Sequence, residues 1–261
     1  MDYLLVSVVA AGASMLTLLS GFGLGTILMP VFALFFPVPA AIAATAVVHL
    51  ANNLFKIVLL GRRADWPVVL RFGLPSALAA AAGAGALVYF ADLPSLAGYE
   101  LLGRTREVTP VKLVIGVVIL FFAVLELIPS FAKLALPRRY LAVGGLLSGF
   151  FGGLSGNQGA LRSAFLIKAG LGKEAFVATG VVCAVIVDVV RLAVYGGGSL
   201  WAHFNLLASG VAGPVAVAIV AAFAGACFGA RVLEKITYRA VRLIVAAGMM
   251  LVGIGLAAGL I

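Results

Sequence analysis

Long apolar stretches, interrupted only by short charged clusters, run along the whole of this chain. Of its 261 residues, 64% are hydrophobic and only 10% are charged, and the mean hydropathy is +1.23. Because a water-soluble domain carries roughly 25% charged residues, these values exclude a soluble globular fold. The bilayer is therefore the expected solvent, and the sequence predicts an all-α polytopic membrane protein.

Breaks at proline, glycine and charge clusters divide the chain into eight apolar segments. The segments span residues 3–36, 40–61, 68–91, 110–129, 140–168, 174–196, 204–230 and 239–261. The first and fifth are the longest, and each contains a glycine-rich interruption, at residues 20–25 and 152–159. About 30 residues at about 1.5 Å each is long for one span and short for two. Each long segment therefore suits a re-entrant hairpin of two half-helices; the alternative is one long tilted helix whose glycines serve close packing.

The two halves of the chain repeat the same order of segments. With a shift of 134 residues, Gly25 falls on Gly159 and the pair Ala44-Thr45 falls on Ala178-Thr179. The sequence thus predicts a duplication, with a first repeat at 1–129 and a second at 130–261. Each repeat would consist of a broken-helix hairpin followed by three transmembrane helices.

The placement of basic residues decides between topologies. If all eight segments crossed the bilayer, the basic residues of the loops would divide six against nine between its two sides, which is no bias. If the first and fifth are re-entrant, only Arg104, Arg106 and Lys112 lie on one side. The other side then holds twelve: Arg62, Arg63, Arg71, Lys133, Arg138, Arg139, Lys168, Lys173, Arg231, Lys235, Arg239 and Arg242. By the positive-inside rule that side is cytoplasmic, both termini face outward, and three crossings per half make the repeats inverted.

The net charge of +9 would suggest nucleic acid as a partner of a soluble protein, but here the basic residues lie mostly between apolar segments. We therefore expect the lipid bilayer, and no nucleic acid, as a partner. The sequence contains no nucleotide motif, phosphate-binding loop or metal-ligand cluster, and both cysteines lie in apolar stretches. We expect no cofactor, and transport driven by an ion or solute gradient, with a proton as one candidate for the coupling ion.

Three basic residues, Lys56, Arg162 and Arg191, lie inside apolar segments, where an ion costs at least about 2.5 kcal/mol. Arg162 follows Gly159 by three residues, which places it on the first turn of the returning half-helix. The free N–H groups of that turn also favour an anion. Thr26, Asn157 and Gln158 belong to the same hairpin tips, so the sequence favours a small oxyanion over a cation.

The other intramembrane polar residues each allow two interpretations. Asp188 and Arg191 share a helix face at i, i+3 spacing and form either a structural ion pair or part of the site. Lys56 continues a polar stripe with Asn53, and it either faces a hydrated cavity or extends toward the basic interface. His49 and Cys183 coincide under the 134-residue shift and are either placed symmetrically about the site or packed in the core.

The segments SGFGLGTILMPVFALFFPVPAAIAATAVVHLANNLFK and GLLSGFFGGLSGNQGALRSAFLIKAGLGKEAFVATGVVCAVIVDVVRLAVYG resemble the paired motifs of the TauE/SafE sulfite-exporter family of membrane permeases. The glycine-rich turn followed by Pro30 is similar to the first motif, and the run leading to Arg162 is similar to the second. The resemblance covers nearly the whole chain. It implies a permease of the bacterial cytoplasmic (inner) membrane for sulfite, thiosulfate, sulfonates or related organic anions.

The leading hypothesis is a secondary transporter that works by alternating access between two inverted halves. The predicted substrate-binding residues are Thr26, Asn53, Lys56, Ser155, Asn157, Gln158, Arg162, Cys183, Asp188 and Arg191. The alternatives are an anion channel and a non-transporting assembly or receptor component. An enzyme is not expected, because the only nucleophile and base to consider, Cys183 and His49, lie in no supporting motif. The sequence leaves the oligomeric state open.

Overall fold

The computed structural model describes residues 3–20, 24–101, 103–128, 134–197, 200–232 and 238–261 and is mostly helical. Its α-helices are α1 (Tyr3–Ser20), α2 (Leu24–Ala33), α3 (Val38–Leu60), α4 (Trp66–Ala91), α5 (Pro110–Leu127), α7 (Leu141–Ser155), α8 (Gly159–Leu166), α9 (Lys173–Gly197), α10 (Leu200–Val232) and α11 (Tyr238–Ala257). Two short 3₁₀ helices, η1 (Gly61–Arg63) and η2 (Arg138–Tyr140), and two strands, β1 (Ala97–Leu101) and β2 (Arg104–Val108), complete it.

Five stretches within the described helices are long and apolar enough to cross a bilayer. They are Val38–Val58, Trp66–Ala91, Pro110–Leu127, Lys173–Gly197 and Gly210–Phe228. Shorter apolar helices cover Tyr3–Met15, Leu24–Ala33 and Val245–Ala257. The predicted segment 239–261 corresponds to α11, whose described apolar part is one of these shorter stretches. The chain is thus a polytopic membrane protein, as the sequence predicted.

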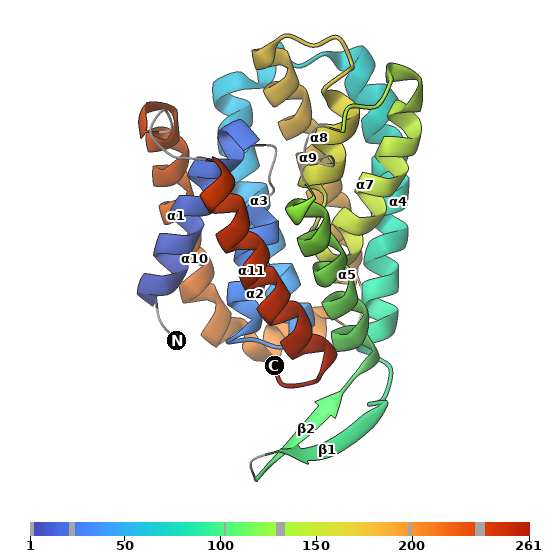
Figure 1. Ribbon diagram of the computed structural model, residues 1–261, viewed down its shortest axis with the longest axis vertical. Helices are drawn as coiled ribbons and strands as arrows, with labels where there is room; N and C mark the ends of the chain where they lie inside the picture. The colour runs from blue at the N-terminus through green and yellow to red at the C-terminus, as the bar shows by residue number, and fades with distance from the viewer. Residues whose placement is uncertain (1–2, 21–23, 102, 129–133, 198–199, 233–237) are drawn as a thin grey trace.

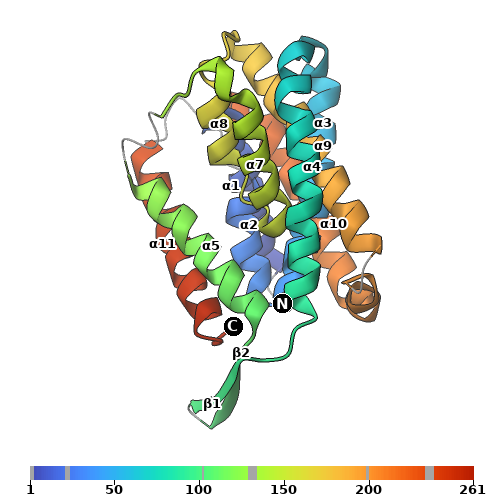
Figure 2. The same cartoon turned by 90° about the vertical axis from the view of Figure 1, so that its right-hand side faces the viewer.

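Each of the two long apolar segments is broken into two helices that run in opposite directions. Both termini and the β1–β2 hairpin lie at one end of the molecule, and α1 rises from that end while α2 returns toward it (Figure 1). The pair α7–α8 enters from the opposite end, where η1 joins α3 to α4 (Figure 2). A hydrogen bond also links the two ends of the second pair: the N–H of Leu136, just before α7, donates to the carbonyl of Ala164 on α8 at 3.0 Å.

Helix starts follow local sequence signals. Asp65 caps α4, since its Oδ1 accepts the N–H of Val68 at 2.9 Å, and Thr109 caps α5 through the N–H of Lys112 at 3.4 Å. Both helices carry a proline in their first turn, where its missing N–H costs nothing. These caps set the ends of two spanning helices at the membrane surface.

The first helix of each hairpin packs along a helix of the other half of the chain. α7 lies against α4, and α1 lies against α10. Glycines allow the close approach: a Cβ on Gly149 would lie 2.2 Å from the carbonyl oxygen of Ser76, and one on Gly225 would lie 2.1 Å from that of Ala11. Two further pairs, α3 with α9 and α5 with α11, also join the two halves.

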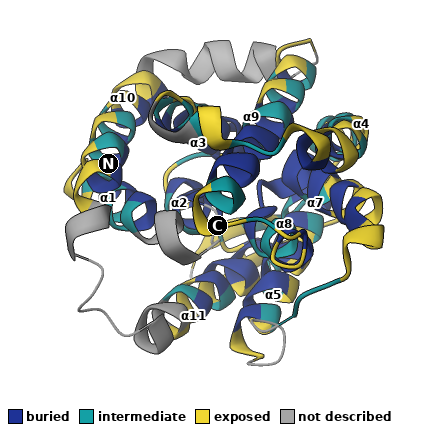
Figure 3. Cartoon of the chain, turned by 90° about the horizontal axis from the view of Figure 1, so that it is seen from above, coloured by how far each residue is buried: buried dark blue, intermediate teal, exposed yellow. Residues whose placement is uncertain are grey.

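Burial follows the pattern expected for lipid as solvent. Seen along the bundle, buried residues face inward while exposed residues cover the outer faces of the helices (Figure 3). Many of the exposed side chains are large and apolar, among them Leu78 on α4, Phe121 on α5 and Leu251 on α11. Such side chains are suited to acyl chains, so the outer face is a lipid-facing surface.

A β-hairpin that the sequence did not predict fills the segment between α4 and α5. β1 and β2 are antiparallel and project beyond the helices on the side of the termini. The hairpin is tied to the C-terminal end of the chain, because Tyr99 donates to the carbonyl of Ala258 at 2.5 Å and Arg106 to that of Leu260 at 2.6 Å. A two-stranded ribbon is marginal alone, so these bonds help to hold it in place.

Candidate functional site

The tip of the second hairpin is a tight turn that only glycine forms without strain. Gly156 ends α7 in the left-handed conformation, at φ +83°, and its N–H donates to the carbonyl of Gly152 at 3.0 Å. Gln158 precedes the first residue of α8. Gly25, at the start of α2, faces this turn closely, since a Cβ there would lie 3.3 Å from the carbonyl oxygen of Gly156. The start of α2 and the end of α7 thus meet inside the protein.

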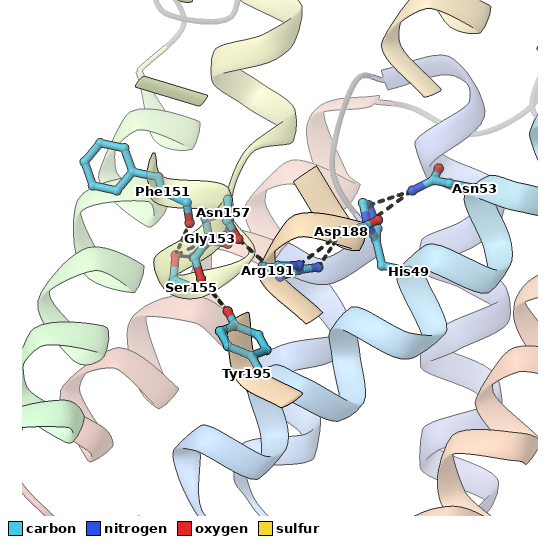
Figure 4. A network of polar contacts seen from close by, with 10 residues as sticks. His49, Asn53, Phe151, Gly153, Ser155, Asn157, Asp188, Arg191 and Tyr195 are labelled. Carbon is cyan, nitrogen blue, oxygen red and sulfur yellow. Dashed lines mark hydrogen bonds and ion pairs between the residues drawn. The ribbon is translucent and has the colours of Figure 1, made fainter. Parts of the chain in front are cut away.

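Helix α9 holds the end of α7 through two side chains. Nη1 of Arg191 donates to the carbonyl of Gly152 at 3.2 Å, and the hydroxyl of Tyr195 donates to the carbonyl of Gly153 (Figure 4). The last carbonyls of a helix carry its negative dipole end and need donors, which a cation supplies well. Arg191 and Tyr195 therefore fix the position of the break.

Asp188 connects this anchor to α3. Its Oδ1 accepts from Nε and Nη2 of Arg191 at 3.1 and 2.7 Å, and its Oδ2 lies 2.6 Å from Nδ1 of His49. The Asp188 and Arg191 side chains are fully buried, and that of His49 is 4% exposed. The predicted pairing of Asp188 with Arg191 is present, and Arg191 commits Nε, Nη1 and Nη2 to protein acceptors. A buried pair this well satisfied acts as a fixed structural element.

Arg162 differs from Arg191 because one nitrogen of its guanidinium has no hydrogen-bond partner among the described residues. It lies on the first turn of α8, where its N–H bonds to the carbonyl of Gln158 at 2.9 Å. Its side chain runs along α9, since a Cβ on Gly180 would lie 3.5 Å from its Nε. Within the part of the chain that the structure describes, the buried Nη1 of Arg162 and Nε2 of Gln158 have no hydrogen-bond partner. Two buried donors, one of them cationic, thus remain for an acceptor that the described residues do not supply.

Lys56 brings a second positive charge to this region. Its side chain is only 4% exposed, so it does not extend to an exposed surface, and its charge interacts with that of Arg162. One turn earlier on α3, Nδ2 of Asn53 lies 3.2 Å from Nδ1 and 3.3 Å from Nε2 of His49. Asn52 accepts a hydrogen bond from Ser14 of α1 at 2.9 Å. The polar stripe of α3 is therefore buried within the protein.

The remaining predicted residues lie in the turn that ends α7, at the start of α2 and on α9. Oγ of Ser155 accepts from the backbone N–H and the side-chain amide of Asn157 at 3.4 and 3.2 Å, which stabilises the turn. Thr26 is buried in the first turn of α2. Cys183 is buried in an apolar cluster with Phe72 of α4. It also lies within range of electrostatic interaction with Arg162.

Sequence reasoning left two members of this network out of the predicted site. His49 was considered and not included, and Tyr195 was not singled out. Tyr195 follows Arg191 by four residues, so helical spacing places both on one face of α9 and could have found it. Nothing in the local sequence joins His49 to Asp188, because they lie on different helices 139 residues apart.

A bundle of apolar helices around a buried cluster of charges and broken-helix ends defines a polytopic membrane protein of the transporter class. The family described as "Sulfite exporter TauE/SafE" matches residues 5–256, so the chain belongs to that family. Membership implies a membrane transporter of sulfite or related anions, and the family is not one of enzymes. No curated protein and no solved structure matches the chain.

Proposed function

We propose that this protein is a secondary transporter that binds a small oxyanion at Arg162 and exposes it alternately to the two sides of the membrane. The observation that carries the proposal is the buried Nη1 of Arg162, from which no described residue accepts a hydrogen bond. Nε2 of Gln158, one helical turn earlier, also has no partner among the described residues. An unsatisfied buried donor costs about 1–3 kcal/mol, and more when it is charged. An anion with several acceptor oxygens removes this cost at both groups.

The charges near the site favour an anion over a cation. Arg191 and Asp188 neutralise each other, whereas Arg162 and Lys56 are two further basic groups that interact electrostatically. Planar guanidinium and amide donors suit the oxygens of sulfite, thiosulfate or an organosulfonate. The substrate class comes from the family, and Arg162, Gln158 and Lys56 are the residues we propose to contact it. Asn53, Asp188 and Arg191 would position these groups.

Two inverted halves, 1–129 and 130–261, would supply the alternating access. The packing of the hairpins supports this part of the proposal. The first helix of each hairpin packs on a long helix of the other half: α7 packs on α4, and α1 packs on α10. Entry of the two hairpins from opposite ends is also what an inverted pair requires (Figures 1 and 2).

The same arrangement supports a definite orientation in the bacterial cytoplasmic membrane. Arg62 and Arg63 in η1 and Arg138 and Arg139 in η2 lie at the end opposite the termini, so that end would be cytoplasmic. Single cysteines in the loops 37–39 and 169–173 test the orientation. An impermeant thiol reagent added outside should label the first and not the second; the reverse pattern would contradict the proposed topology.

Flux measurements in proteoliposomes test the function itself. Purified protein is reconstituted, and uptake of radiolabelled thiosulfate and sulfite is compared among the native chain, Arg162→Ala and Arg162→Lys. Arg71→Ala is the matched control, because Arg71 is exposed on α4. We expect Arg162→Ala to abolish saturable uptake, Arg162→Lys to retain a fraction and the control to match the native chain. Uptake by Arg162→Ala equal to the native rate would refute the proposed site.

Exchange distinguishes a transporter from a channel. With the membrane potential clamped at zero, vesicles preloaded with unlabelled anion should take up labelled anion faster than empty vesicles, because a loaded site returns across the membrane. Under the same clamp a channel would show no such stimulation, because labelled anion passes through it independently of unlabelled anion.

A further inference from the structure

We propose that His49, held by Asp188, is a proton-binding site whose occupancy is coupled to the anion at Arg162, so that the protein moves an anion and a proton together. The inference rests on the proposed transport function and adds a coupling ion and a site for it. It starts from a buried imidazole that the anion site itself does not use.

The hydrogen bonds of His49 indicate which of its two ring nitrogens carries the proton of the neutral imidazole. Nδ1 lies 2.6 Å from a carboxylate oxygen of Asp188, so the nitrogen donates and its proton is on Nδ1. Nδ2 of Asn53 lies 3.2 Å from Nδ1 and 3.3 Å from Nε2. Because Nδ1 already donates to Asp188, Nε2 is the ring nitrogen that can accept from this amide, and in that tautomer it carries no proton. His49 is therefore neutral in this arrangement and has one free position for a proton, at Nε2.

Protonation of Nε2 needs only a local change. The incoming proton, delivered from water, forms an N–H bond at Nε2, while the N–H at Nδ1 stays on Asp188. The Asn53 amide would then have to turn so that its oxygen, rather than its nitrogen, faces Nε2. Asp188 can serve the imidazolium through Oδ2 because Oδ1 alone accepts both bonds from Arg191.

The charges that face His49 come from three helices. Asp188 and Arg191 lie on α9, Arg162 lies on α8, and Lys56 lies on α3 itself, two turns further along. The described side chains of α2 and α10, which also pack on α3, include no charged residue. The elements η1, α4 and α5 contact α3 as well, and they carry exposed Arg62, Arg63 and Arg71, half-buried Lys112 and buried Glu126. Asp188 is the anion hydrogen-bonded to His49 and already balances Arg191, so a protonated His49 would be a further cation that Arg162 repels.

An anion bound at Arg162 changes this balance. It neutralises the charge of Arg162, which acts on His49, and so removes repulsion from a second proton on His49. By linkage, a proton on His49 strengthens anion binding by the same factor, because the coupling between two sites is reciprocal. Binding of the two together, with return of the empty site, is symport.

His49 lies at the contact between the two proposed halves, so its protonation would change that contact. The His49–Asp188 bond joins α3 to α9, which belong to opposite halves of the proposed repeat, and Arg191 extends the chain of bonds to the tip of α7 (Figure 4). A change of charge at His49 therefore acts on the contact between the halves.

Accumulation of thiosulfate in proteoliposomes tests the coupling. Thiosulfate stays fully ionised near neutral pH, whereas sulfite takes up a proton there and would confuse the result. With the membrane potential clamped at zero and the outside more acidic, one proton per anion gives about tenfold accumulation for each pH unit. We expect this in the native chain and in His203→Gln, the same substitution at the chain's other histidine. We expect His49→Gln, whose amide can still donate to Asp188, to exchange thiosulfate without accumulating it.

A second measurement does not depend on any variant. Thiosulfate added to the native protein in weakly buffered detergent solution should cause uptake of protons, detected with a pH indicator. Absence of proton uptake would overturn the inference. Exchange by the native chain without pH-driven accumulation would also overturn it while leaving the transporter in place. Absence of exchange in the native chain would refute the proposed function and this inference with it.

Discussion

Gly156→Ala tests whether the broken tip of α7 is held as tightly as its contacts indicate. At φ +83°, an alanine costs roughly 1–2 kcal/mol relative to glycine. In addition, its Cβ would lie 2.9 Å from Nη1 of Arg191, which is fully buried and fixed by Asp188. Moving Nη1 breaks its bond to Gly152, and a bond to a charged group contributes about 1.5–3 kcal/mol. We expect a total loss of about 2.5–5 kcal/mol in the free energy of unfolding.

Gly170→Ala is the matched control for this substitution. Gly170 has φ +80°, and a Cβ there would meet no atom within 4 Å, so only the backbone cost of roughly 1–2 kcal/mol applies. Thermal unfolding in detergent, followed by intrinsic fluorescence, ranks the two variants against the native chain. In an Arg191→Lys background the extra cost at Gly156 should vanish, because lysine lacks the guanidinium nitrogen that the Cβ meets. Equal destabilisation by Gly156→Ala and Gly170→Ala would refute the argument.

Three further substitutions test the packing and charge of the site. Tyr195→Phe removes the hydrogen bond to α7 and should cost about 1 kcal/mol in detergent unfolding, while Tyr89→Phe, on an exposed residue, should cost nothing measurable. Gly149→Ala places a Cβ 2.2 Å from the backbone of α4 and should abolish the monodisperse peak in size-exclusion chromatography, whereas Gly85→Ala, with open space around it, should not. Lys56→Met should raise the thiosulfate concentration for half-maximal uptake about tenfold or more, because the bound anion would lose one neighbouring basic group; an unchanged value would remove Lys56 from the proposed site.

Apolar segment length and glycine placement were enough to predict most of the helical layout. The two interrupted segments are each two helices in the structure, and the interruptions at residues 20–25 and 152–159 contain the breaks. The missed element is the β1–β2 hairpin. Its ten strand residues are almost all exposed and show no buried face, so no alternating pattern marks them as strands.

The sequence also named most of the buried polar residues without showing how they differ. Arg162 and Arg191 are alike as cations inside apolar segments, and both were predicted to bind substrate. Their hydrogen bonds separate them, because Arg191 is used by Asp188 and by the end of α7, whereas Arg162 keeps a buried nitrogen unpaired among the described residues.

Local features of the chain specify the solvent, the helices and their breaks. These depend on local properties: apolar length sets a span, glycine permits the turn at Gly156, and an i, i+3 spacing pairs Asp188 with Arg191. The contacts of His49 with Asp188 and of Gly25 with Gly156 depend instead on the folded arrangement of the helices. Such contacts join helices distant in the chain, and their choice depends on how the whole bundle packs, which no single segment encodes.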